Sequence, residues 1–267
     1  MQADDYRISV IITSYNKRDF LIEAIDSVIG QTFRPHEIIV ADDGSSDGSP
    51  EAIRDYMTRY PGWVRGIFQE HNVGIPKNRN SALRAVTGNY VGILDGDDLF
   101  LPDKLEKQVT ALQANPAARV VYTNFRRVEE DGSTEVELRF DKPQPQGEVL
   151  ADIARMKFGL LRTLIADYDL VRQAGFMDER FPRYDGLLLS IKLASMTPFA
   201  YLHEPLVNKR QHPGSDSTSN TVLDNLQEQL GIFRDIQPLL ASRLDADTIR
   251  SINERWKHRL IKQLNKL

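Results

Sequence analysis

Short apolar runs alternate with segments of helical periodicity along the first half of the chain. Five segments have the length and apolar content of buried strands: residues 8–12, 37–41, 64–68, 90–94 and 119–124. Apolar residues recur at helical spacing between them, in residues 20–29, 49–57, 76–86 and 101–112. Repeated β-α-β units with short loops form sheets that helices cover on both faces. We therefore predict an α/β fold with a mostly parallel central sheet flanked by helices.

Two proline dipeptides indicate where helices begin. Ser49-Pro50 is typical of an N-cap followed by proline at the first helical position, and Leu101-Pro102 predicts the start of another helix. After about residue 125 the alternation weakens, although Asp131-Gly132 predicts a hairpin turn. Further helices are expected near residues 149–158, up to Gly175, from 184 to about 196, from about Val222 and from about Asp247. The polar run 209–220 predicts a mobile loop.

Composition narrows the class of protein. The 267 residues suffice to bury a substantial core, and the net charge of −4 argues against a nucleic-acid partner, which needs a basic surface. The chain has no cysteine, which excludes disulfides and a thiol nucleophile. Residues 1–5 lack the pattern of a secretion signal, and no apolar run approaches bilayer length. We expect a cytoplasmic protein.

The acidic motif Asp95-Gly96-Asp97-Asp98 closes the apolar run 90–94. In an extended backbone residues i and i+2 point to the same side, so Asp95 and Asp97 can face one spot. Clustered carboxylates repel one another unless a cation lies between them. Mg²⁺ binds one or two carboxylates and leaves other positions for water and phosphate oxygens. The motif therefore predicts a divalent metal site that also holds a diphosphate.

Three polar motifs follow predicted strands: Thr13-Ser14-Tyr15-Asn16, Asp42-Asp43-Gly44-Ser45 and Asp95-Gly96-Asp97-Asp98. Ligands of α/β sheets bind beyond the carboxyl ends of parallel strands. We expect the three motifs to meet at one edge of the sheet.

The order and spacing of these motifs, with Asn72-Val73-Gly74 and Arg79-Asn80 between the last two, resemble family 2 glycosyltransferases of the GT-A fold. The resemblance is specific over residues 7–115 and looser up to 220. It implies a GT-A domain over 1–220, with a nucleotide-binding half at 1–115 and an acceptor-binding half at 116–220. We expect residues 221–267 to form a C-terminal helical extension.

The resemblance also implies a function: inverting transfer of a sugar from a nucleotide-diphosphate donor to a hydroxyl of a saccharide or lipid-linked saccharide, with Mg²⁺ or Mn²⁺. Such transfer serves polysaccharide or glycoconjugate synthesis. A UDP-sugar is the favoured donor, because a carboxylate acceptor suits a base that presents a ring N–H. The alternative is a catalytically inactive sugar-nucleotide or carbohydrate-binding module on the same fold.

By resemblance, five residues lie on the donor side. Thr13 and Tyr15 match the family's start, where the aromatic ring covers the base; the alternative is a tyrosine that closes the core. Asp43 matches the acid that accepts from uracil, with Asp42 as a ribose or structural neighbour, although both could serve only as caps or turns. Arg79 matches a position near the nucleotide, and its alternative is a solvated helix face.

The metal and base positions also follow from the resemblance. Asp97 matches the direct metal ligand and Asp95 the residue that meets ribose or a metal-bound water. His212 matches a histidine that completes the metal or diphosphate site when its loop closes. Asp185 matches the general base, which must take the acceptor's proton; its alternative role is a helix N-cap. Tyr184 departs from the family, where an acid is common before the base.

The C-terminal segment combines an apolar stripe with many basic residues. A basic amphipathic helix can lie on an anionic membrane surface, which would make the protein peripheral on the inner face of the cell membrane. The stripe can also pack on the protein's own core or on a second copy of the chain.

Overall fold

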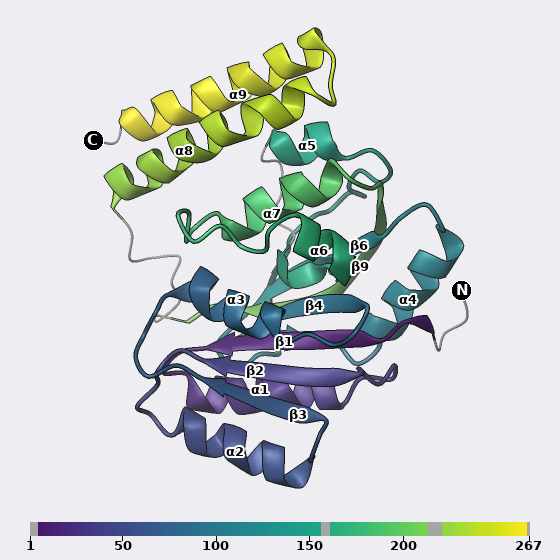
Figure 1. Ribbon diagram of the computed structural model, residues 1–267, viewed down its shortest axis with the longest axis vertical. Coiled ribbons are helices and arrows are strands. Elements are labelled where there is room, and N and C mark those ends of the chain that lie inside the picture. The colour runs from purple at the N-terminus through teal and green to yellow at the C-terminus, as the bar shows by residue number, and fades with distance from the viewer. Residues whose placement is uncertain (1–4, 156–160, 213–220, 266–267) are drawn as a thin grey trace.

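The computed structural model describes residues 5–155, 161–212 and 221–265 (Figure 1). The four strands of the first half are parallel in the spatial order β3-β2-β1-β4. Their bounds are β1 (Ile8–Ser14), β2 (Glu37–Asp42), β3 (Val64–Phe68) and β4 (Tyr90–Asp95). The predicted strands and their parallel arrangement are therefore confirmed for this half.

Side chains of β1 alternate between two apolar layers, as the period of a strand requires. Val10 and Ile12 join the layer under α1 (Arg18–Ile29), α2 (Ser49–Arg59) and α4 (Lys104–Ala114). Ile11 joins the opposite layer, under α3 (Ile75–Arg84), α5 (Leu150–Ala154), α6 (Tyr168–Gln173) and α7 (Asp185–Ala194). Helices therefore cover both faces of the sheet, as predicted.

The second half extends the sheet with strands of both directions. Strand β8 (Ile165–Asp167) lies antiparallel between β4 and β6 (Val120–Val128). Strand β9 (Phe199–Arg210) runs parallel to β6, while β5 (Leu99–Phe100) and β7 (Glu135–Leu138) pair antiparallel with β9 and β6. The whole sheet is thus mixed. Strands of two or three residues are too short to show a period in the sequence, so β5 and β8 give little local signal. The hairpin turn predicted at Asp131-Gly132 is confirmed, because it joins β6 to β7.

Three predicted boundaries differ from the structure. Ser49 is the first residue of α2, and its N-cap is Gly48 with a positive φ of 90°. Helix α4 begins at Lys104, after the short strand β5. The expected loop 209–220 is wrong at its start, because Lys209 and Arg210 pair with Arg127 and Val128 as the end of β9. Residues 213–220 lie outside the described residues.

The C-terminal helices α8 (Val222–Ala241) and α9 (Ala246–Leu264) lie side by side at one end of the molecule (Figure 1). Ile232 and Trp256 are buried in the same apolar layer as α7, and the Trp256 indole donates a hydrogen bond of 2.7 Å to the Ala154 carbonyl. Of the three alternatives for the stripe of α9, packing on the protein's own core is therefore confirmed for its first half. At its end, Leu264 is exposed.

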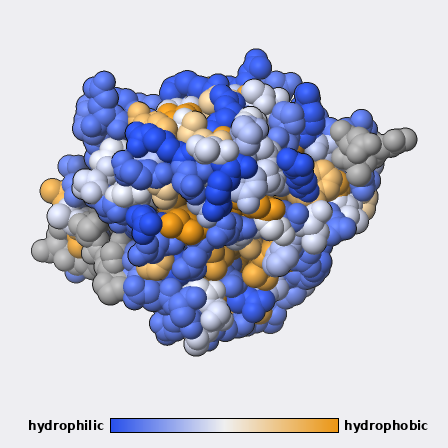
Figure 2. Space-filling view, turned by 90° about the horizontal axis from the view of Figure 1, so that it is seen from below, coloured by the Kyte–Doolittle hydropathy of each residue, from blue (hydrophilic) through white to orange (hydrophobic). Residues whose placement is uncertain are grey.

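At the opposite end of the molecule, the view from below shows hydrophobic residues interspersed with hydrophilic ones (Figure 2). In the described part of the chain, no helix combines the length and the apolar character that crossing a bilayer requires.

Candidate functional site

The register of the parallel strands brings the three polar motifs together. Thr13 pairs with Asp95 across β1 and β4, and Ser14 pairs with Asp42 across β1 and β2. Beyond the strands, the backbone N–H of Gly96 donates to the Thr13 carbonyl at 2.9 Å. A Cβ at Gly96 would lie 2.9 Å from this same oxygen, so the close approach requires glycine. The predicted convergence at one edge of the sheet is confirmed.

Each acid of the motif at the end of β4 is paired with cationic side chains. Asp95 contacts Arg79 and lies 2.9 Å from Arg162. Asp97 accepts from Lys17 at 2.5 Å, and the same oxygen lies 3.0 Å from His212 Nε2. The cluster is thus neutralised largely by the protein's own cations.

Asp98 is the most buried acid of the motif, at 1% exposed. It accepts a hydrogen bond of 3.1 Å from the backbone N–H of Arg210, and its other oxygen lies 3.2 Å from Arg162 Nε. Asp98 does not cap helix α4, because the N-cap residue of that helix is Asp103. Asp98 therefore supports the site by holding Arg162.

Burial and neighbouring charges move the pKa values of these acids in opposite directions. Burial alone raises the pKa of Asp95, but the guanidinium groups of Arg79 and Arg162 outweigh it and hold that pKa far below its usual range. Burial also raises the pKa of Asp97, and Lys17 and His212 bring it below the usual value. For Asp98, burial dominates and raises the pKa to about 7, although Arg162 opposes the shift. At neutral pH Asp95 and Asp97 are therefore carboxylates.

Asp185 lies at the same site, although it comes from the second half of the chain. It is the first residue of α7, 5% exposed, and one carboxylate oxygen accepts from Arg79 at 2.7 Å. The other oxygen accepts from the N–H of Gly186 at 2.6 Å. Arg79 thus joins Asp185 to Asp95. Its alternative role on a solvated helix face is wrong, because Arg79 is 7% exposed.

The donor-side residues of β1 and β2 differ in exposure. Tyr15 is 44% exposed, so it does not close the core, and Thr13 beside it is half-buried. Asp42 is buried and accepts from the N–H of Ser45 at 2.9 Å. Asp43 accepts from the N–H groups of Val73 at 2.8 Å and Gly74 at 3.1 Å, and so fixes the following loop. These are the contacts that the alternative role of Asp42 and Asp43 as caps or turns predicts.

His212 lies two residues after β9, and its side chain is 5% exposed. Its ring packs 4.8 Å from the ring of Phe20 at the start of α1. A carboxylate oxygen suits Mg²⁺ or Mn²⁺, which take further ligands from water and phosphate, whereas an imidazole nitrogen suits a transition metal better than Mg²⁺. In residues 5–155, 161–212 and 221–265, no three His, Asp or Glu side chains group as a complete ion site. Asp97 and His212 are the pair that would hold a divalent ion.

Two cations of the site were not predicted from the sequence. Lys17 follows the motif at the end of β1 and contacts Asp97, and its position there is the only sequence signal for it. Arg162 belongs to a short 3₁₀ helix, Leu161–Thr163, whose sequence is unremarkable. Only the packing of that turn against β4 brings Arg162 to the acids.

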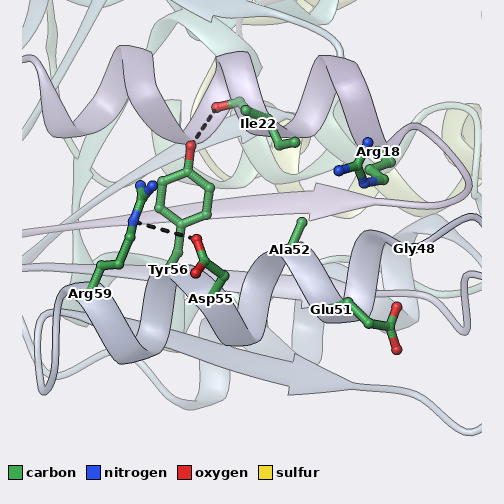
Figure 3. Close-up of a pocket in the computed structure, with 8 residues that line it drawn as sticks. All are labelled: Arg18, Ile22, Gly48, Glu51, Ala52, Asp55, Tyr56 and Arg59. Carbon is green, nitrogen blue, oxygen red and sulfur yellow. Dashed lines mark hydrogen bonds and ion pairs between the residues drawn. The ribbon is translucent and has the colours of Figure 1, made fainter.

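A hollow of about 380 Å³ lies elsewhere, between α1 and α2 (Figure 3). At one end of this hollow, Arg59 lies 3.5 Å from Asp55 and over the ring of Tyr56 at 4.3 Å (Figure 3). The guanidinium group of Arg59 is thus paired with side chains of its own helix. None of these three residues belongs to the acidic cluster.

Comparison with known proteins identifies the family. The profile of Glycosyl transferase family 2 matches residues 9–175, which is more than half of the chain. The chain therefore belongs to glycosyl transferase family 2. The resemblance predicted from the motifs and the predicted GT-A fold are confirmed.

Two curated relatives match this chain over part of their own length. An uncharacterized protein of Mycobacterium tuberculosis is 37% identical over 132 residues, which cover 49% of this chain and 38% of that one. An uncharacterized glycosyltransferase of Rickettsia typhi is 29% identical over 229 residues, covering 83% of this chain and 68% of that one. The matched part of this chain thus spans well under half the length of the mycobacterial relative.

Among solved structures, Staphylococcus aureus TarS residues 1–349 in complex with UDP-GlcNAc superposes with a TM-score of 0.72. The identity is 20%, and the match covers 86% of this chain and 66% of that one. At this identity the likeness shows the fold alone.

Proposed function

From family membership and the geometry of the site, we propose that this protein is an inverting glycosyltransferase. It moves a sugar from a nucleotide-diphosphate donor, favoured to be a UDP-sugar, to a hydroxyl of a saccharide or lipid-linked acceptor. The observation that carries the proposal is that Arg79 joins Asp95, at the end of β4 and two residues before Asp97, to Asp185 at the start of α7. The complex of TarS with UDP-GlcNAc supports the choice of donor.

On the donor side, the exposed ring of Tyr15 is available to stack on the base, an interaction worth roughly 1–3 kcal/mol. Thr13 and Asp42 lie near the carboxyl ends of the neighbouring strands β1 and β2. Asp43 has further lone pairs beyond its two backbone contacts and would accept from a uracil N–H. Arg79 and Asp95 form the boundary between this region and the acceptor side.

The diphosphate is expected next to Asp97 and His212, which would hold Mg²⁺ or Mn²⁺. A bound ion neutralises the charge that grows on the departing nucleotide diphosphate. The ammonium group of Lys17 contacts the carboxylate oxygen of Asp97 that also lies next to His212. When a metal ion takes the place of this ammonium group, Lys17 would turn toward a phosphate.

On the acceptor side, Asp185 is proposed as the general base that accepts the proton of the attacking hydroxyl. Its two contacts, from Arg79 and from the N–H of Gly186, fix the carboxylate in one orientation. Each oxygen retains lone pairs that can accept a further hydrogen bond. A base held in this way needs no reorganisation before proton transfer.

A binding module without turnover is the second candidate. Tyr184 in place of an acid, and the tight pairing of Asp185 with Arg79, favour this alternative. It predicts that the protein binds a nucleotide sugar and releases no nucleotide diphosphate with any acceptor.

The test measures the thermal stability of the protein with UDP and a panel of nucleotide sugars, with and without Mn²⁺. A ligand that binds the folded state raises the melting temperature. We expect a metal-dependent rise that Asp97→Ala abolishes. Asp103→Asn, a change at the half-buried N-cap residue of α4, should leave the rise intact.

Release of UDP in the presence of saccharide acceptors then separates the two candidates. We expect Asp185→Asn to keep donor binding and to lose turnover by about 10²-fold or more. Donor binding without turnover in the unchanged protein would favour the binding module, and no nucleotide-dependent shift at all would refute both.

A further inference from the structure

Helix α9 carries four basic or titratable residues on one flank. Arg255, His258, Arg259 and Lys262 have the spacing i, i+3, i+4 and i+7, which places them on one side of a helix. With Arg155, which follows α5, and the buried ring of Trp256, they line a hollow of about 260 Å³. We call this the basic hollow.

Few acidic groups neutralise the basic hollow. Among the described residues, the only salt bridge of its five cationic or titratable members joins Arg155 to Asp152, at a long distance of 3.9 Å. No acid occurs between Arg255 and Leu264, although the whole chain has a net charge of −4. The positive charge is therefore concentrated at this place and is not a general property of the surface.

The guanidinium groups of the basic hollow are held in place through their Nε atoms. Arg255 Nε donates to the Arg155 carbonyl at 2.8 Å, and Arg259 Nε donates to Gln229 Oε1 at 3.1 Å. In the described part of the chain, neither residue has a recorded hydrogen bond from an Nη atom. Positioned guanidinium groups with available donors are the geometry that binds a phosphate through two parallel hydrogen bonds.

A chain of hydrogen bonds links the basic hollow to the candidate active site. Gln229, which is fully buried, accepts from Arg259 and donates to the Tyr184 hydroxyl at 2.7 Å. Tyr184 directly precedes Asp185, the proposed base. The basic hollow thus lies on the acceptor half, two hydrogen bonds from the neighbour of Asp185.

We propose that the basic hollow binds a phosphate group of an anionic ligand. The cations, their positioning and the lack of neutralising acids all favour this ligand class, and the proposal does not require the transfer reaction to be correct. The phosphate can belong to a free molecule or to a lipid headgroup. Ile261 and Leu264, exposed by 46% and 51% at the end of the same helix, suit the second source.

The test uses Trp256 as a reporter. The chain has two tryptophans, so Trp63→Phe leaves Trp256 as the sole source of tryptophan emission. Inorganic pyrophosphate is titrated first, and then vesicles of phosphatidylcholine with and without an equal part of phosphatidylglycerol. Saturable change with pyrophosphate identifies a free phosphate-bearing ligand, and change only with the anionic vesicles identifies a headgroup. Either result supports the proposal.

Arg255→Gln with Lys262→Gln is the decisive variant, and Arg250→Gln with Lys257→Gln is its control. The control pair removes the same charge from the same helix but does not line the basic hollow. We expect the first pair to weaken binding by about 30-fold, since each Lys or Arg near an anionic surface contributes roughly fivefold. The control pair should have a much smaller effect.

Lys262→Gln alone is a second variant that removes no recorded hydrogen bond or ion pair, and we expect it to weaken binding about fivefold. Equal binding by the decisive and control variants, or no emission change with any probe, would overturn the proposal.

Discussion

Arg79 donates a hydrogen bond of 2.7 Å to Asp185, which lies 106 residues further along the chain. The other end of the same guanidinium contacts Asp95 at the carboxyl end of β4. One buried cation therefore joins the proposed donor side to the proposed base. Because both carboxylates are largely buried, each depends on this cation for its stability as an ion.

Arg79→Met should destabilise the protein by about 3–5 kcal/mol, because it leaves buried carboxylates without their partner. Adding Asp185→Asn should then cost less than it does in the unchanged protein, with a coupling of about 1–3 kcal/mol. Urea unfolding of the four proteins measures both values. Arg54→Met, which removes an exposed ion pair with Glu51, is the control and should change stability by less than about 1 kcal/mol. Strictly additive effects would contradict the coupling.

Lys17→Met should increase the affinity for Mn²⁺ in the absence of nucleotide. The Lys17 ammonium lies 2.5 Å from Asp97 and competes with any other cation for that carboxylate. We expect on the order of a tenfold gain, equivalent to about 1.4 kcal/mol, measured by calorimetric titration. Lys107→Met, at a half-buried lysine paired with Asp103 and Glu204, should leave the affinity unchanged. Unchanged or weaker binding in Lys17→Met would show that Lys17 does not compete.

Glu37→Gln should cost roughly 2 kcal/mol of stability at neutral pH. The buried Glu37 carboxylate accepts from Ser9, Arg65 and both donors of Thr87, each at 2.7 Å. Burial raises the pKa of Glu37, but these hydrogen bonds outweigh it and lower that pKa.

A lowered pKa in the folded state stabilises the protein above the unfolded carboxyl value, about 4.3, and the gain is lost as the pH falls through the folded value. The difference between native protein and Glu37→Gln should therefore narrow below about pH 4. Unfolding by urea at several pH values measures it. A penalty that stays constant down to pH 3 would be inconsistent with this account.

Lys104→Met should stabilise the protein, and more so in acid than in base. Lys104 is fully buried, donates to Gln108 and lies over the ring of Phe100, and burial lowers its pKa to about 7. Between pH 7 and the unfolded value of about 10.4, the unfolded chain binds more protons, so the contribution of Lys104 to stability rises with pH.

The gain from Lys104→Met at pH 6 should therefore exceed the gain at pH 10, by roughly 2 kcal/mol or more. Thermal unfolding of both proteins across this range measures the difference. Lys107→Met, at a half-buried lysine of the same helix whose ammonium group is paired with Asp103 and Glu204, should show no such trend. A gain independent of pH would mean that Lys104 keeps its charge throughout.

The candidate site could be predicted in outline because its acids follow strands. The motifs after β1, β2 and β4 come from parallel neighbours, and parallel strands end at the same edge. Thr13, Asp42 and Asp95 therefore meet as expected. The family profile confirms the resemblance that these motifs indicated. The roles assigned to Tyr15, Asp43, Asp97, His212 and Asp185 stay predictions.

The sequence by itself determined the order of the main helices and strands and the gathering of acids at one edge, since local periodicity and strand polarity are properties of neighbouring residues. Only the tertiary structure decided that Arg162 and Lys17 neutralise those acids, that β8 enters antiparallel, and that Trp256 packs on Ala154. These pairings join residues far apart in the chain. Their energy depends on burial and on distances that no local pattern encodes.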